Sequence, residues 1–183
     1  MSKLLEKLNK EQKAAVVNTE GPLLILAGAG SGKTGVLTHR IAYIIEQDLA
    51  YGENILAVTF TNKAAGEMRE RVNKLLGGKV KVPWIGTFHS ICIRILKRDG
   101  YHINLESNFS IYDEDDSISV IKQVIKKLKI DDKTNPKAVK GYISSAKNEL
   151  IGPSEYENFA QGYFQEKVSS IYKEYQKSLR ENN

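Results

Sequence analysis

The sequence predicts an α/β fold in which a parallel sheet with crossover helices is followed by an all-helical subdomain. In the first 112 residues, short apolar runs alternate with segments of helical periodicity, as a parallel sheet with crossover helices requires. After Tyr112 no strand-like run follows, and the apolar stripes have helical spacing. We therefore expect one domain at residues 1–112 and a second at residues 113–183.

The first domain opens with a helix at Asn9–Val17, with Asn9 as N-cap and Gln12 three residues later, the pattern of a capping box. The run Asn54–Phe60 is apolar enough for a strand buried on both faces, as in parallel sheets. The expected strands and helices are, in chain order, strand Pro22–Leu26, helix Gly32–Gln47, strand Asn54–Phe60, helix Thr61–Leu76, strand Trp84–Gly86, helix Phe88–Lys97 and a short fourth strand at Phe109–Tyr112.

The second domain is expected to consist of helices. One begins with the acids Asp113–Asp116 and ends in lysines, a polarity that suits the helix dipole. A second is expected at Lys137–Glu149, and a third from Phe164 to Leu179. Because the third has no glycine or proline stop, we expect the native chain to continue beyond Asn183.

Between the first expected strand and the next helix lies a glycine-rich loop made of Ala27, Gly28, Ala29, Gly30, Ser31, Gly32, Lys33 and Thr34. This context is typical of a phosphate-binding loop, because glycines let backbone N–H groups point at phosphate oxygens. It predicts a nucleoside triphosphate, with Lys33 on the β and γ phosphates and the Thr34 hydroxyl on Mg²⁺. Ala27 stands where glycine is usual, and the alternative is a flexible turn with a chance Gly-Lys-Thr sequence.

Two strand–helix junctions, Thr59–Ala65 and Gly86–Ser90, carry aromatic and polar residues in the same arrangement. Ligands of open α/β sheets bind beyond the carboxyl ends of the strands. In the first junction, Phe60 could stack on a base while Asn62 and Lys63 hold a nucleic-acid backbone. The alternative is that this aromatic lies in the core and the threonine after it only caps a helix.

Gln12 and Asp113 each have two interpretations. A glutamine can recognise adenine with one donor and one acceptor, but the residues alone favour the capping role for Gln12. Hydrolysis needs an acid after an apolar strand, and Asp113 offers one, but a helix start explains it better. The histidines and Cys92 lack metal-ligand spacing, so we expect no metal other than Mg²⁺.

Composition fits a cytoplasmic protein and is compatible with a nucleic-acid partner. Hydrophobic residues make up 41% of the 183 residues, and no apolar run approaches the roughly 20 residues that span a bilayer. The one cysteine fits a reducing cytoplasm. The net charge of +5 comes from residues 1–112, which hold 15 lysines and arginines against 10 acids, and this is compatible with nucleic acid.

Taken together, these segments resemble the UvrD/PcrA group of superfamily 1 DNA helicases. The matching segments are Leu8–Gln12 with Ala15 and Val16, Ala27–Thr34, Thr59–Ala65 with Glu67 and Met68, Gly86–Ser90, and Lys147–Leu150. The family commonly begins its phosphate loop with alanine. The resemblance implies an incomplete P-loop NTPase domain of RecA-like fold, domain 1A, at residues 1–112, and part of the helical subdomain 1B at residues 113–183.

The resemblance also implies residue roles. Gln12 would recognise adenine, the loop from Ala27 to Thr34 would hold the phosphates, and Thr34 would bind Mg²⁺. The residues expected to contact single-stranded DNA are Phe60, Asn62, Lys63, Thr87 and His89. The sequence departs from the family at Gly35 and Gly66, where basic residues are common.

The function that the resemblance implies is that of an ATP-dependent DNA helicase that moves 3′→5′ on single-stranded DNA and unwinds duplex in repair or replication. Its expected partners are ATP with Mg²⁺, single-stranded DNA and junctions of single- and double-stranded DNA, without a membrane. The fragment itself is expected to be monomeric and inactive, because the family's Asp-Glu motif, arginine fingers and second motor domain would follow Asn183. The alternatives are a stand-alone ATP-binding switch or nucleic-acid-binding module, or a small P-loop kinase.

Overall fold

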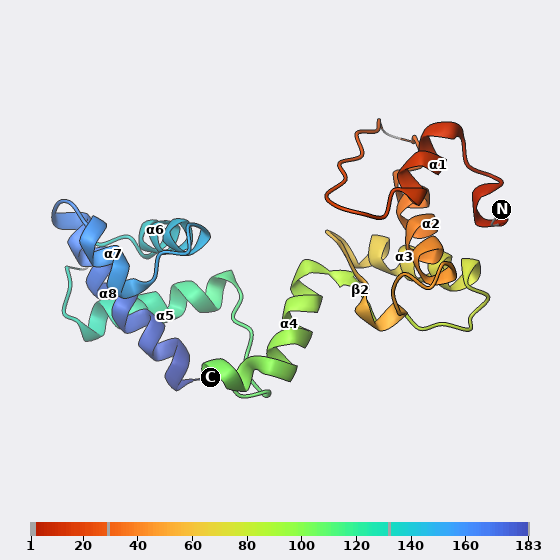
Figure 1. Ribbon diagram of the computed structural model, residues 1–183. Helices are drawn as coiled ribbons and strands as arrows, with labels where there is room; N and C mark the ends of the chain where they lie inside the picture. The colour runs from red at the N-terminus through yellow and green to blue at the C-terminus, as the bar shows by residue number, and fades with distance from the viewer. Residues whose placement is uncertain (1–2, 29, 132, 183) are drawn as a thin grey trace. The chain divides into compact units, whose positions relative to one another are not determined.

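The computed structural model describes residues 3–28, 30–131 and 133–182, and Figure 1 shows its elements. They are η1 (Lys3–Leu5), α1 (Lys10–Val17), α2 (Lys33–Glu46), η2 (Gly52–Asn54), β1 (Leu56–Thr59), α3 (Asn62–Leu75), β2 (Trp84–Thr87), α4 (Phe88–Asp99), η3 (Gly100–Ile103), α5 (Glu114–Lys127), α6 (Pro136–Asn148), α7 (Pro153–Phe159) and α8 (Tyr163–Glu181). The chain divides into two compact units, Met1–Ile95 and Leu96–Asn183. Their assignment to helicase domains 1A and 1B stays a prediction.

The first unit contains a small parallel sheet covered by helices. β1 pairs with β2 in parallel, with Thr59 opposite Thr87 at the end of the pair. Parallel strands need a crossover connection, and α3 supplies it. The core of this unit consists of Ile41 from α2, Met68 and Val72 from α3, Val82, and Ile85 from β2. The predicted mixed α/β architecture with a parallel strand pair is therefore confirmed.

Local signals in the sequence set the helix ends. Asn9 caps α1: its side chain accepts from the Gln12 backbone N–H at 2.8 Å, and the Gln12 side chain accepts from the Asn9 N–H at 3.1 Å. The Thr61 hydroxyl caps α3 by accepting from the Ala64 N–H at 3.1 Å. After α3, Gly77 has a φ of +64°, a left-handed conformation that glycine adopts without strain. The capping box and both helix starts are confirmed.

Three strand predictions need correction. Pro22–Leu26 forms no strand, and Leu24 and Leu26 are 81% and 86% exposed. Figure 1 shows the segment as an irregular stretch between α1 and α2. An apolar run becomes a strand only where a neighbouring strand takes its backbone hydrogen bonds, and the described sheet is β1 and β2 alone.

The other two corrections concern Asn54–Phe60 and Phe109–Tyr112. In the first run the strand covers only Leu56–Thr59, and Leu56 is 59% exposed, so the prediction of burial on both faces was wrong. The second run is not a strand but a loop that leads into α5. The sequence did not predict α7, which has seven residues and buries Tyr156.

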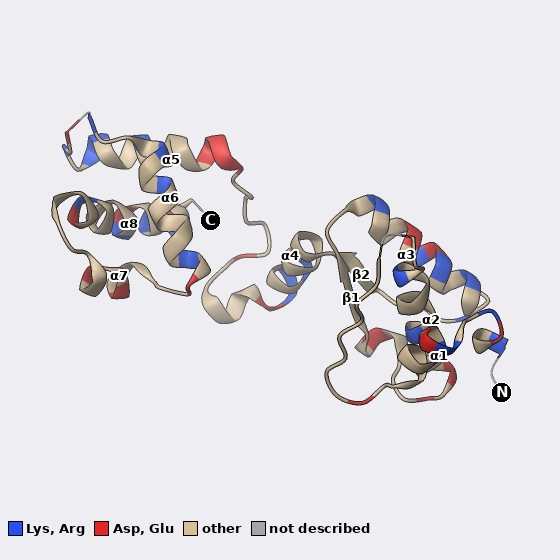
Figure 2. Cartoon of the chain, turned by 90° about the horizontal axis from the view of Figure 1, so that it is seen from above, with Lys and Arg blue, Asp and Glu red and all other residues tan. Residues whose placement is uncertain are grey.

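The described residues of the second unit form helices and no strand, as predicted for residues 113–183. α5, α6, α7 and α8 share one core, whose most buried members include Ile121, Val139, Val168, Ile171 and Tyr172. The buried Tyr172 hydroxyl donates to the Ile151 carbonyl oxygen at 3.0 Å, and burial raises the pKa of this phenol, which favours the protonated donor. Figure 2 shows the acids in the first turn of α5 and lysines toward its other end. Among the described residues, no helix combines the length and apolarity needed to cross a membrane.

Candidate functional site

The phosphate-loop lysine is folded onto the backbone of its own loop. Lys33 is the first residue of α2, and its ammonium donates to the carbonyl oxygens of Ala27 at 2.8 Å and Gly28 at 2.7 Å. The Ser31 hydroxyl donates to the same Gly28 oxygen at 2.7 Å. The loop thus curls around a positive charge at the start of a helix, where backbone N–H groups lack intrahelical partners and attract anions.

Glycines shape this loop. Gly30 and Gly32 have φ values of +75° and +87°, in the left-handed region that favours glycine, and Gly32 is the N-cap of α2. Thr34, the predicted Mg²⁺ ligand, is half-buried in the first turn of the helix. Ala29 lies outside the described residues. Glycines at these positions are what the phosphate-loop pattern predicts.

Gln12 reaches the loop from α1. Its Nε2 donates to the Ser31 carbonyl oxygen at 3.1 Å, while its Oε1 accepts from the Asn9 N–H at 3.1 Å. A primary amide has two N–H donors and two acceptor lone pairs, so one of each is left for a further partner. The capping role and adenine recognition are therefore compatible at Gln12, although the sequence presented them as alternatives.

A pocket lies beside the loop. It encloses about 260 Å³ and is lined by Asn9, Glu11, Gln12, Ala15, Ile25, Leu26, Ala27, Ser31, Lys33 and Val36. Apolar side chains alternate here with the amide of Gln12 and the ammonium of Lys33, a combination that suits a base and a phosphate chain.

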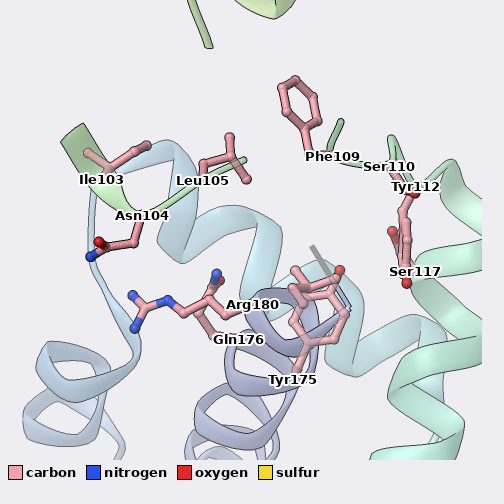
Figure 3. Close-up of a pocket in the computed structure, with 11 residues that line it drawn as sticks. Ile103, Asn104, Leu105, Phe109, Ser110, Tyr112, Ser117, Tyr175, Gln176 and Arg180 are labelled. Carbon is pink, nitrogen blue, oxygen red and sulfur yellow. The ribbon is translucent and has the colours of Figure 1, made fainter. Parts of the chain in front are cut away.

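A larger cavity of about 470 Å³ lies in the helical unit (Figure 3). Its lining residues are Ile103, Asn104, Leu105, Phe109, Ser110, Tyr112, Ser117, Tyr175, Gln176, Leu179 and Arg180. None of the predicted site residues lies among them. Size alone would favour this cavity, but the smaller pocket adjoins the predicted phosphate loop and its lysine, so we expect the nucleotide there.

Two phenylalanines lie together where the strands end. Because Thr59 pairs with Thr87, the residues that follow them, Phe60 and Phe88, are neighbours, and their ring centroids are 5.5 Å apart. Phe60 is 90% exposed and Phe88 48% exposed. The alternative that Phe60 belongs to the core is therefore wrong. Exposed aromatic rings offer a stacking surface for bases.

Phe88 belongs to the second junction but was not among the residues expected to contact DNA. The signal was present, because both junctions have a threonine and then a phenylalanine before their polar residues. Asn62, Lys63 and His89 are exposed beside the phenylalanines in sequence. Thr87 differs: it is 8% exposed, and its hydroxyl accepts from the Ser90 N–H at 3.2 Å. The direct DNA contacts of these residues stay predictions.

Comparison with known proteins decides the family. The model of the UvrD/REP helicase N-terminal domain matches residues 8–183. The chain belongs to the UvrD/REP helicase family. It is 52% identical over 182 residues to the ATP-dependent DNA helicase PcrA of Bacillus subtilis (strain 168) and 51% identical over 183 residues to that of Staphylococcus aureus (strain Mu50 / ATCC 700699). These alignments cover 99% and 100% of the chain but 25% of each relative, so the chain spans about a quarter of their length.

The resemblance to the UvrD/PcrA group drawn from the sequence is thus confirmed. The structure also shows how much space surrounds Gly35 and Gly66, the two positions where the sequence departs from the family. A Cβ added at Gly35 or Gly66 would meet nothing within 4 Å, so the space for larger side chains is present at both positions.

Asp113 is expected to stabilise α5 rather than to serve nucleotide hydrolysis. Its carboxylate accepts from the Asp116 N–H at 2.9 Å, and the Asp116 carboxylate accepts from the Asp113 N–H at 3.2 Å. Asp113→Ala should lower the free energy of unfolding by about 0.5–2 kcal/mol, and Asp113→Asn should be nearly neutral because asparagine also caps helices. Urea denaturation measures both. A changed Mg²⁺ dependence of ATP binding in Asp113→Asn would instead support a role of this carboxylate at the nucleotide.

Proposed function

We propose that this chain is the N-terminal, ATP-binding part of an ATP-dependent DNA helicase that moves 3′→5′ along single-stranded DNA and unwinds duplex in repair or replication. The observation that carries the proposal is the meeting of Gln12 and Lys33 at one glycine-rich loop beside a pocket. A base-reading amide and a phosphate-reading ammonium at one pocket are the requirements of a site for ATP. Membership in the helicase family and the parallel strand pair support a P-loop, RecA-like domain.

Each part of the proposed site has its own task. The loop N–H groups and Lys33 would hold the β and γ phosphates, and Thr34 would hold Mg²⁺, which offsets phosphate charge when bound. Phe60 and Phe88 would stack on bases of single-stranded DNA. Asn62, Lys63, Thr87 and His89 would complete that interface, as the resemblance predicts.

The remaining parts of the proposal follow from the relatives. The relatives from Bacillus subtilis and Staphylococcus aureus are both named ATP-dependent DNA helicase PcrA. By extension we propose that the partners of this protein are ATP, Mg²⁺ and DNA with single-stranded regions and junctions, in the cytoplasm. A monomeric state of the 183-residue chain belongs to the same proposal.

Strand displacement tests the proposal. The full-length helicase that carries this chain as its N-terminal part should release the labelled strand of a duplex with a 3′ single-stranded tail in the presence of ATP and Mg²⁺. A duplex with a 5′ tail and a reaction with a non-hydrolysable ATP analogue are the matched controls. Equal release from both tails would contradict the direction.

The 183-residue chain alone provides a second arm of the same test. We expect no DNA-stimulated phosphate release from it, because phosphoryl transfer to water needs a water-orienting residue and charge offset besides the phosphate cradle. Turnover near one per second, abolished by Asp113→Asn, would instead support the alternative of a complete small ATPase.

A further inference from the structure

Side-chain hydrogen bonds connect both ends of α1 to the rest of its unit. Near its start, the Gln12 amide donates to Ser31 of the phosphate loop. At its end, the guanidinium of Arg40 donates from Nη1 to the carbonyl oxygen of Ala15 at 2.8 Å and also to the carbonyl oxygen of Asn18. Arg40 lies on α2, so this second tie joins the two helices.

The chemistry of the second tie suits a helix end. The last four carbonyl oxygens of a helix have no intrahelical donor, and the oxygen of Ala15 is one of them. A cation at a C-terminus is also favoured by the helix dipole. Val16, which lies between Ala15 and Asn18, is fully buried. The half-buried Arg40 therefore caps α1 and holds it against α2.

Because α1 is short, its stability depends on these hydrogen bonds. It has eight residues, and helices shorter than about 12–15 residues are marginal without tertiary contacts. Arg40 lies seven residues, or two turns, after Lys33, so both project from one face of α2. The same helix face therefore carries the phosphate-reading lysine and the arginine that holds the helix with Gln12.

The orientation of the Gln12 amide is also fixed. Its Oε1 accepts from Asn9 and its Nε2 donates to Ser31, so a flip of the amide would break both bonds. Adenine offers an amino donor and the N7 acceptor on one edge, whereas guanine offers two acceptors there. An amide held with one free acceptor and one free donor can accept from the amino group of adenine and donate to its N7. With guanine the same Oε1 would face the O6 acceptor, and no hydrogen bond could form between them.

We propose that Arg40 is a positioning residue for base selection: by holding α1 on α2, it keeps the Gln12 amide beside the phosphate loop and so sets the preference for adenine over guanine nucleotides. The proposal rests on the proposed function of Gln12 in ATP binding. It assigns to Arg40 no contact with the nucleotide.

The test compares the affinities of fluorescent ATP and GTP analogues with Mg²⁺. In Arg40→Met, which keeps an apolar stem, the ratio of GTP to ATP dissociation constants should fall at least about fivefold, while the affinity for inorganic tripolyphosphate changes less than about twofold. Gln12→Ala should lower the ratio similarly, and the double variant should lower it no further, because coupled residues are not additive. Arg94→Met is the matched control, since Arg94 also donates to a backbone carbonyl in this unit, that of Pro83.

The results of this test distinguish failure of the positioning role of Arg40 from failure of the adenine role of Gln12. Equal losses of ATP, GTP and tripolyphosphate in Arg40→Met would overturn the positioning role, since that pattern is general destabilisation. A ratio unchanged in Gln12→Ala would overturn the adenine role of the proposed function instead. Arg40→Lys, which keeps the charge but not the forked donor group, should give an intermediate ratio and replaces the methionine variant if that one does not fold.

Amide hydrogen exchange gives a readout that needs no nucleotide. In Arg40→Met the amides of α1 should exchange at least about tenfold faster, and those of α5 to α8 should be unchanged. Unchanged exchange in α1 would overturn the positioning role whatever the nucleotide affinities are.

Discussion

Lys33→Ala is expected to weaken binding of a fluorescent ATP analogue by about 10- to 150-fold. A hydrogen bond to a charged group contributes about 1.5–3 kcal/mol, and each 1.4 kcal/mol corresponds to a factor of ten in affinity. In the structure the ammonium already lies at the loop, 2.7 Å from the Gly28 carbonyl oxygen, so it has little distance to travel to a phosphate. Titration of the analogue with Mg²⁺ measures the loss.

Lys74→Ala is the control for this prediction. Lys74 is an exposed lysine in the last turn of α3, so its removal takes away the same charge without touching the loop. Circular dichroism establishes that each variant keeps its helices. Equal affinity of Lys33→Ala and the unchanged chain would refute the phosphate-loop assignment.

Phe60→Ala is expected to weaken binding of single-stranded DNA by about 5- to 150-fold, because a stacked base contributes about 1–3 kcal/mol. Phe88→Ala should give a loss of the same kind, since its ring lies 5.5 Å from that of Phe60. Fluorescence anisotropy of a labelled oligothymidine measures both. The affinity should also fall as salt increases, because bound phosphates release counterions.

Tyr51→Ala provides an aromatic control. Tyr51 is also strongly exposed in the first unit but lies before β1, away from the carboxyl ends of the strands. It should leave the affinity for single-stranded DNA within about twofold. Unfolding of Phe60→Ala, or DNA affinity equal to that of the Tyr51 variant, would contradict the stacking role.

Helices were the most predictable part of the fold, because their signals are local. Asn9 with Gln12, Thr61 and Asp113 each carry a capping side chain that the structure shows in use. The periodic apolar positions of α3, α5 and α8 likewise lie in the two cores. Such features depend on residues three or four apart and need no information from the rest of the chain.

Strands were less predictable, because a strand depends on partners that its own residues do not specify. Leu56–Thr59 pairs with β2, whereas the equally apolar Pro22–Leu26 has no strand beside it in the described residues. For the same reason the sequence could not place Arg40, whose partners at the end of α1 lie 22 and 25 residues away. The contact between Phe60 and Phe88 could be predicted only with the strand register, although the threonine–phenylalanine pair repeated in both junctions indicated it.

The exposed leucines of Pro22–Leu26 also bear on how the chain behaves at high concentration. β1 and β2 each present one backbone edge without a strand partner in the described sheet, and Leu24, Leu26 and Leu56 lie largely in solvent. Open edges and apolar runs are where chains add to one another in cross-β association. A net charge of +5 opposes this through mutual repulsion, which salt screens. The colloidal stability of the isolated chain should therefore be greatest in dilute, low-salt buffer.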